Sequence, residues 1–206
     1  MKHLLLVAAL ASAPVAAVPL KYSKPSDPLA IEAMHNFGAC VARQSPDRAR
    51  QLLATDFRLE EYGERMRMLA RRHDGCASPG TVLRFNRLLF AGALAEALLE
   101  PEIASGGDSR ILARDPDKPA IEARDGVETM ALCTVFAAPA GTAALLTSAP
   151  ASQEESAAVT AIAPTLSTCL SKDSKVELNH PALRSLLALA AWRIAKSNGA
   201  FEEAAE

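Results

Sequence analysis

The sequence predicts an all-α fold, built as two tandem copies of a four-helix unit. The first observation is the spacing of the cysteines: Cys76 follows Cys40 by 36 residues, and Cys169 follows Cys133 by the same interval. The second is that Cys133 follows Cys40 by 93 residues, and at this offset the two halves align without a gap. The third is that apolar residues recur at helical spacing after cap signals in both halves. We therefore expect one pseudo-symmetric, disulfide-stapled helical domain.

The offset of 93 residues matches residue types that are scarce in this chain as well as its abundant Ala and Leu. Because Cys, Pro and Asn fall where caps, turns and cross-links are needed, chance alignment of a common residue type does not explain them. The matched positions are Pro46 with Pro139, Ser78 with Ser171, Asn86 with Asn179, Leu52–Leu53 with Leu145–Leu146, and Leu94–Ala95 with Leu187–Ala188.

Residues 1–17 are predicted to be a bacterial export signal. Lys2 precedes an apolar run from Leu4 to Ala11, and small residues then lead to a cleavage site after Ala17. The mature chain would begin at Val18 and reside in the periplasm or outside the cell. Such a compartment is oxidising, which favours disulfides over free thiols.

The alternative for the N-terminus is an uncleaved membrane anchor. The apolar stretch from Leu4 to Leu20 is interrupted by Pro14 and Pro19. It is also shorter than the roughly 20 apolar residues that a bilayer span needs. We therefore expect no stable membrane span after cleavage.

The first copy, residues 18–99, is expected to contain four helices. A helix begins at Asp27–Pro28 and ends near Arg43, and a short one begins at Ser45–Pro46. A third runs from about Leu59 to His73, and the fourth covers about 87–99 after a short stretch, 82–85, that can be extended.

The second copy, residues 119–206, repeats the pattern with different surfaces. Ala138–Pro139 begins the short helix, and Ser152 to Glu155 has the form of a capping box. Pro164 should kink that helix or end it early. Residues 175–178 are the counterpart of the extended stretch, and Asn179 is expected to cap a final helix over 181–197.

Residues 100–118 are predicted to be an acidic connector loop between the copies. Pro101, Ser105–Asp108 and Asp115–Pro116 are typical of loops. The flanking helices are the most apolar parts of the mature chain, over Leu88–Ala95 and Leu186–Trp192. A helix that is apolar nearly all round must be buried, so the copies should share one core and form one joint domain over 18–206.

Symmetry selects one of the three possible disulfide pairings. Only Cys40 with Cys76 and Cys133 with Cys169 give both copies the same internal bond. Each bond would close a loop of about 36 residues and contribute roughly 4 kcal/mol in the chain-entropy model.

A zinc site formed by His35, Cys40, His73 and Cys76 is the alternative use of the first two cysteines. In the second copy both cysteines recur, but the two histidines are replaced by Glu128 and Leu166. Because only the cysteines repeat, we expect disulfides and neither a metal nor another cofactor.

Glu96 and Arg184 fall inside the apolar helices, and they are the candidate buried polar site. A buried charge costs several kcal/mol unless it is paired. Either the two side chains meet across the core or line a pocket for a polar ligand group, or each points to solvent at a helix edge.

Composition and motifs indicate only the broad class of function to which this chain belongs. The net charge of -2 and the pI of about 6.1 argue against a nucleic-acid partner, which requires a basic surface. Common metalloprotease, hydrolase and nucleotide-binding motifs are absent, so no catalytic residues are assigned. We expect an exported, non-enzymatic protein of the cell envelope that binds an unknown protein or small ligand. The alternative is an exported hydrolase-type enzyme with dispersed catalytic residues.

Overall fold

The computed structural model describes residues 27–77, 86–106, 109–171 and 178–201, and every regular element in these ranges is helical. The all-α class is thus confirmed for these residues. The elements are α1 (Pro28–Gln44), α2 (Pro46–Ala54), α3 (Glu60–Arg72), α4 (Arg87–Gly106), α5 (Gly126–Ala137), α6 (Pro139–Thr147), α7 (Gln153–Cys169) and α8 (His180–Ser197), with short 3-10 turns η1 (Asp74–Cys76) and η2 (Ser109–Leu112). The predicted signal peptide and the stretches 82–85 and 175–177 lie outside the described residues.

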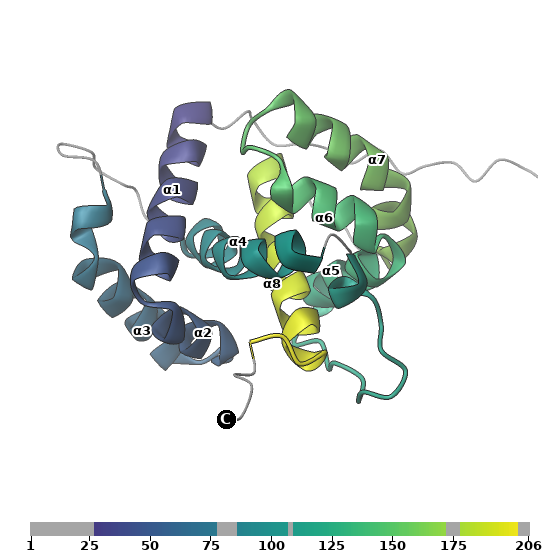
Figure 1. The fold of residues 1–206 in the computed structure, drawn as a ribbon, viewed down its shortest axis with the longest axis horizontal. Coiled ribbons are helices and arrows are strands. Elements are labelled where there is room, and N and C mark those ends of the chain that lie inside the picture. The colour runs from purple at the N-terminus through teal and green to yellow at the C-terminus, as the bar shows by residue number, and fades with distance from the viewer. Residues whose placement is uncertain (1–26, 78–85, 107–108, 172–177, 202–206) are drawn as a thin grey trace, which may run out of the picture.

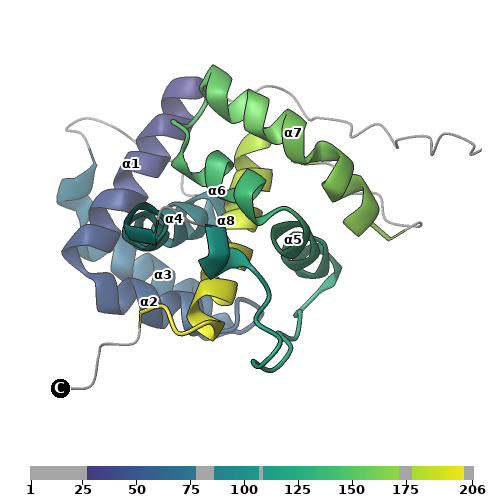
Figure 2. The same cartoon turned by 45° about the vertical axis from the view of Figure 1, so that its right-hand side comes forward.

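Two helices, α4 and α8, cross at the centre of the molecule. Helices α1 to α3 lie on one side of this crossing and α5 to α7 on the other (Figures 1 and 2). Both central helices are buried along most of their length, as their apolar sequences predict. One continuous hydrophobic core joins side chains from both halves of the chain, among them Phe90 and Leu94 of α4 and Leu183 and Leu187 of α8.

Side-chain caps define where several helices begin. Asp27 accepts a hydrogen bond from the Leu29 N–H, and Pro28 follows at the first helical position of α1. Asn179 caps α8 by accepting from Ala182 N–H at 2.9 Å. These two starts agree with the sequence-based prediction to within one residue.

The start of α7 differs from a standard capping box in one respect. Ser152 accepts from the Glu155 N–H at 3.0 Å, as expected. The Glu155 carboxylate, however, accepts from the N–H of Ala151, one residue before the cap, at 2.7 Å. Glu155 is thereby held inside the protein rather than at its surface.

Two expected helix ends are wrong. Helix α7 does not end at Pro164 but continues to Cys169. Burial of Leu166 stabilises this additional turn. Helix α4 continues through Pro101 to Gly106, so the first part of the predicted 100–118 loop is helical. Ile103 lies in the core, and its burial offsets the hydrogen bond that a proline removes. Residues 109–112 form η2, and of the residues that the structure describes in the predicted loop, 113–118 are the non-helical part.

Corresponding helices in the two halves begin at equal separations along the sequence. The first residues of α2 and α6, of α3 and α7, and of α4 and α8 are each 93 positions apart. Within the described ranges, no single helix has the length and apolar character of a membrane span, and one bent pair, α5 with α6 at 102°, meets both criteria together.

Candidate functional site

Each disulfide joins the first helix of one half, α1 or α5, to a cysteine near the end of the third: Cys76 lies in η1, just after α3, and Cys169 is the last residue of α7. Cys40 is bonded to Cys76 and Cys133 to Cys169, with Cα–Cα distances of 5.8 and 5.7 Å, which is the pairing that the equal spacing predicts. Because Cys40 and Cys76 are bonded to each other, neither offers the thiolate that the alternative zinc site requires. Among the described residues, no group of three or more potential ligands is arranged to hold a metal ion.

Arg184 and Glu96, the two charges predicted from sequence, are in contact. Arg184 of α8 donates from Nε and Nη2 to one carboxylate oxygen of Glu96 of α4, at 2.9 and 2.7 Å. Both side chains are almost completely buried, at 4% and 6% exposure, so the expectation that each points to solvent is wrong. Arg184 also contacts the Glu155 carboxylate at 3.3 Å and donates to the carbonyl oxygens of Leu146 and Ser148.

The Arg184 guanidinium therefore has a complete set of acceptors. Burial alone lowers the pKa of Arg184, but the hydrogen bond and charge of Glu96, with the charge of Glu155, outweigh it and raise the pKa. Sequence analysis missed Glu155, because it reads as the ordinary acidic member of a capping box and nothing in its local pattern indicates a long-range contact.

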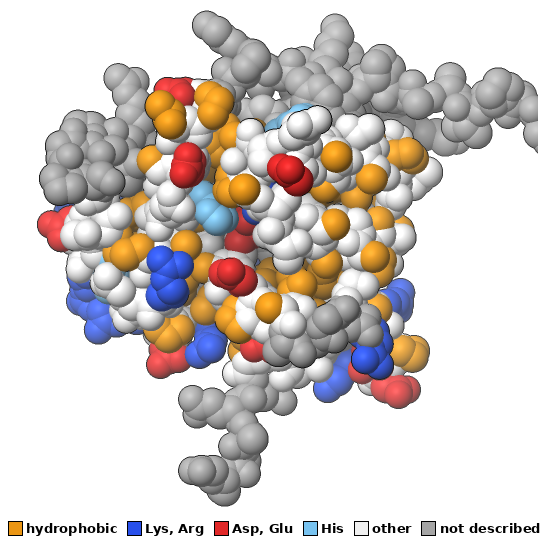
Figure 3. All heavy atoms as spheres, turned by 45° about the horizontal axis from the view of Figure 1, so that its top comes forward, with side chains coloured by type: hydrophobic (Ala, Val, Ile, Leu, Met, Phe, Trp, Pro, Cys, Tyr) orange, Lys and Arg blue, Asp and Glu red, His pale blue; other side chains and the backbone are white. Residues whose placement is uncertain are grey.

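A histidine completes this cluster at the protein surface. His35 of α1 lies 3.0 Å from the same Glu96 oxygen and is only partly buried. The face drawn in Figure 3 has histidine and acidic side chains among hydrophobic ones in its middle. Beside the cluster, only a small cavity of about 20 Å³ remains, lined by Ile31, Met34, His35, Leu89, Ala93, Glu96, Pro150, Pro181, Arg184 and Ser185.

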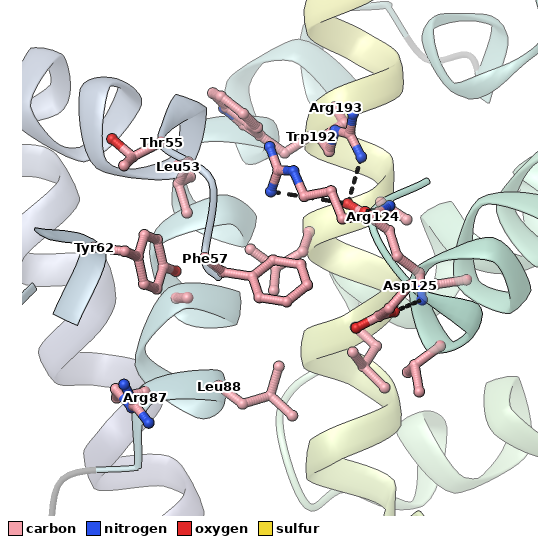
Figure 4. A pocket seen from close by; sticks show the side chains of 17 residues that line it. Leu53, Thr55, Phe57, Tyr62, Arg87, Leu88, Arg124, Asp125, Trp192 and Arg193 are labelled. Atoms are coloured by element: carbon pink, nitrogen blue, oxygen red, sulfur yellow. Dashed lines mark hydrogen bonds and ion pairs between the residues drawn. The ribbon is translucent and has the colours of Figure 1, made fainter. Parts of the chain in front are cut away.

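A much larger cleft, of about 290 Å³, lies on the other side of the α4–α8 crossing. One wall comes from α4, the end of α2, the start of α3 and the segment that joins α2 to α3. The other wall comes from α8, from α5 and from the two residues before α5. Its interior is mainly hydrophobic: Leu53, Phe57, Leu88, Ala91, Val127, Ala131, Leu186, Leu189, Ala190 and Trp192. Figure 4 shows the ring of Phe57 in the middle of this cleft, Tyr62 and Arg87 on one side of it, and Arg193 on the opposite side.

The two acidic residues of the cleft are already engaged by their neighbours. Asp125 caps α5 by accepting from the Glu128 N–H at 2.7 Å. Glu128 pairs with Arg193 and accepts from the Arg124 backbone N–H at 2.6 Å. Arg87 differs: in the described part of the chain it makes no hydrogen bond or ion pair. The cleft thus has one cation more than it has anions.

Contacts with the second half of the chain hold the segment between α2 and α3 in place beside the cleft. Arg58 forms an ion pair with Asp56 and donates to the Arg124 carbonyl oxygen at 3.1 Å. The hydrogen bonds from Arg58 lower the pKa of Asp56 to about 2. Phe57, between them, places its ring 5.5 Å from the Arg124 guanidinium. The α2–α3 segment is therefore fixed against the start of α5.

Tyr62 supplies a hydroxyl group inside the cleft. The side chain is 7% exposed, and burial raises the pKa of its phenol to about 12, although the charges of Arg124 and Arg87 act to lower it. The hydroxyl is therefore protonated at any physiological pH and is available as a hydrogen-bond donor.

Trp192 forms part of the wall and is the single tryptophan in the chain. Its ring stacks on Phe201 at a centroid distance of 6.2 Å, and Lys196 lies 5.4 Å from its centroid. Its indole N–H is buried without a hydrogen-bond partner in the described residues. The indole is thus a natural fluorescent reporter of changes in the cleft.

Sequence analysis did not identify the cleft, because its residues come from five separate segments and carry no short motif. In the sequence, Leu186 and Leu189 are ordinary members of an apolar helix. The hydrolase alternative stays a prediction, and the rings of His35 and His73 contact Glu96 and Gln44, not a hydroxyl nucleophile. Comparison of the chain with protein-family models, with curated proteins and with solved structures finds no match.

Proposed function

We propose that this protein is an exported, non-enzymatic binding protein that holds a small, mostly apolar ligand in the cleft between its two halves. The observation that carries the proposal is the cleft itself: a mainly apolar lining around about 290 Å³, with a few charged side chains in its walls. Small-molecule sites have this character, and their volumes begin near 300 Å³. A protein partner would instead require a broad accessible surface.

The proposal includes the interpretation of the two halves as tandem copies related by an approximate two-fold axis. Gly92 and Ser185 are 93 positions apart, and they face each other where α4 crosses α8. A Cβ atom added at Gly92 would lie 2.4 Å from the Ser185 Cβ. Contact between equivalent positions is what a two-fold axis through the crossing produces.

Under this symmetry, the large cleft and the small cavity are equivalent places in the two copies. Eight of the small cavity's lining residues are 93 positions from a residue that lines the large cleft. The pairs are Ile31 with Arg124, Met34 with Val127, His35 with Glu128, Ala93 with Leu186, Glu96 with Leu189, Phe57 with Pro150, Leu88 with Pro181, and Ala91 with Arg184.

The two equivalent places differ in one decisive substitution. Arg184 fills the small cavity, whereas Ala91, its counterpart, leaves the large cleft open. Glu96 and Glu155, which hold Arg184, correspond to Leu189 and Tyr62 in the open cleft. One place is thus closed by a satisfied ion cluster and the other keeps an apolar void. Because an unfilled apolar void costs stability, its presence supports a binding role. We therefore expect one ligand per chain.

A fluorescence titration tests the proposal with the uncharged dye N-phenyl-1-naphthylamine. We expect saturable binding of one dye molecule per chain, with a change in Trp192 emission because that side chain lines the cleft. Leu189→Phe adds a ring where Leu189 borders the open volume, and it should weaken dye binding by at least about tenfold.

Leu29→Phe is the matched control, because Leu29 is 74% exposed on α1 and does not line the cleft. It should bind the dye with unchanged affinity. Circular dichroism of both variants would show that the helices are retained. If wild-type protein does not bind the dye, or if Leu189→Phe binds it as well as Leu29→Phe does, the cleft is not the ligand site.

Export of the chain is a separate part of the proposal, and it is supported by the two disulfides and the apolar N-terminal sequence. The intact mass of protein recovered from the periplasm tests it. We expect a chain that begins at Val18 and gains about 4 Da when its two disulfides are reduced. A mass that retains Met1 would contradict cleavage of the signal.

A further inference from the structure

We infer that the ligand of the large cleft is an anionic amphiphile, an apolar chain or ring system that ends in a carboxylate. This inference rests on the proposed function and specifies the chemistry of the same site. It is drawn from the charge balance of the cleft and from the position of one cation, Arg87.

The charge balance leaves a place for one negative group. Three arginines line the cleft, Arg87, Arg124 and Arg193, against two carboxylates. Glu128 is shared by Arg124 and Arg193, at 4.0 Å from the first and in direct contact with the second. The Asp125 carboxylate is used as a helix cap. Both acidic groups are thus occupied, and Arg87 is the arginine left without a carboxylate among the described residues.

Arg87 lies where a ligand headgroup would reach it. It is the first residue of α4 and lies at one end of the cleft, beside Leu88 (Figure 4). Its Nη1 atom is close to the backbone of α3, 3.4 Å from where a Cβ at Gly63 would stand. Arg87 is an exposed residue, so its guanidinium can exchange water for a carboxylate, and the planar group of donors fits that anion in a bidentate contact.

Tyr62 adds a second donor to this end of the cleft. Its hydroxyl has no hydrogen-bond partner in the described part of the protein, and the charge of Arg87 acts on it. A carboxylate beside Arg87 would accept from this neutral phenol as well. The hydrophobic interior would then enclose the rest of the molecule, as burial of apolar surface supplies most of the affinity for such ligands.

Three probes separate the contributions of head and chain: decanoate, 1-decanol and acetate, each titrated against full-length mature protein by calorimetry and Trp192 emission. We expect decanoate to bind at least about tenfold more tightly than 1-decanol, because a charge-assisted contact contributes more than a neutral one. Acetate, which lacks the apolar chain, should not bind measurably.

Arg87→Gln is the test variant, and Arg43→Gln, at an exposed arginine near the end of α1, is the matched control. Arg87→Gln should weaken decanoate binding by roughly tenfold to a hundredfold and leave 1-decanol binding unchanged. Arg43→Gln should change neither. Because Arg87 makes no described ion pair, its substitution should not affect folding.

The outcomes distinguish this inference from the proposed function. If decanoate and 1-decanol bind with equal affinity, or if Arg87→Gln weakens both equally, the anionic headgroup is wrong while the apolar site remains. If neither decanoate nor 1-decanol binds, the proposed function itself is wrong.

Discussion

Arg184 of α8 and Glu96 of α4 join the two halves of the chain through two hydrogen bonds, from Nε and Nη2 to one carboxylate oxygen. The contact lies where the central helices cross, and Arg184 extends it to Glu155 of α7 and to carbonyl oxygens at the end of α6. A charge cluster with so little solvent is stable only when every member is satisfied, because an unpaired charge in the interior retains its desolvation cost.

Replacing Arg184 should therefore be strongly destabilising. Arg184→Met leaves the carboxylates of Glu96 and Glu155 buried without their main partner, so we expect a loss of about 3 to 5 kcal/mol in the free energy of unfolding. Urea denaturation followed by circular dichroism measures this loss. Adding Glu96→Gln and Glu155→Gln to the variant should recover part of it, because the unpaired charges are removed.

Arg65→Met is the control for loss of an arginine, since Arg65 pairs with Glu61 at 3.6 Å on the exposed face of α3. Its cost should stay within about 1 kcal/mol. If Arg65→Met and Arg184→Met lower the free energy of unfolding equally, the buried cluster contributes no more to stability than an exposed ion pair does.

The close approach of α4 and α8 depends on Gly92. A methyl group there would lie 2.4 Å from the Cβ and 2.6 Å from the Cα of Ser185, so the two helices would have to separate. We expect Gly92→Ala to lower the free energy of unfolding by about 1 to 3 kcal/mol, as overpacking does elsewhere. Thermal denaturation of the variant measures the effect.

Gly126→Ala serves as the helical control, because nothing lies within 4 Å of the added atom. Alanine is the better helix former, so this variant should be unchanged or up to about 1 kcal/mol more stable. Combining Gly92→Ala with Ser185→Gly should restore only part of the stability, since the Ser185 Cα remains in the way. A fully stable Gly92→Ala protein would argue against the tight crossing.

The two disulfides should contribute similar amounts to stability. Both close loops of the same length, with a sequence separation of 36 residues. In the chain-entropy model, each double Cys→Ser variant should lose roughly 4 kcal/mol. Urea denaturation of the Cys40/Cys76 and Cys133/Cys169 double variants compares them. A loss confined to one of the pairs would mean that the reduced halves differ in residual structure.

Alkaline titration should reveal the environment of Tyr62. Its pKa is raised from 10.0 to about 12 in the folded protein, mainly by burial. Between these values the unfolded chain releases the proton and the folded chain keeps it, so stability falls as the pH rises from about 10 to 12. The loss should reach about 2 to 3 kcal/mol.

Tyr62→Phe removes this titration and provides the comparison. The difference in unfolding free energy between wild type and variant should be constant below pH 10, and above it wild type should lose about 2 to 3 kcal/mol relative to the variant. Absorbance of the phenolate checks the pKa directly, because the step near pH 12 should disappear in the variant. A titration midpoint near 10 for Tyr62 would contradict its burial.

Sequence patterns located most helices because their signals are local. Asp27–Pro28 and Asn179 act within one turn of the helices that they begin. The errors have the opposite origin. Proline rules predicted that a helix ends before Pro101 and that another kinks or ends early at Pro164, but both helices continue past their proline to bury Ile103 and Leu166. Local propensity is a weak preference that packing can override.

For the candidate sites, sequence by itself determined the cysteine pairing and singled out Glu96 and Arg184 as charges in apolar helices. Only the tertiary structure decided that those charges meet and that the opposite cleft is open. The physical reason is that the contact between Glu96 and Arg184 and the open volume of the cleft both depend on which faces of α4 and α8 touch. Side chains from distant segments of the chain determine which faces these are. Arg184 has acceptors on three other helices, whereas Ala91 leaves the space beside it unfilled.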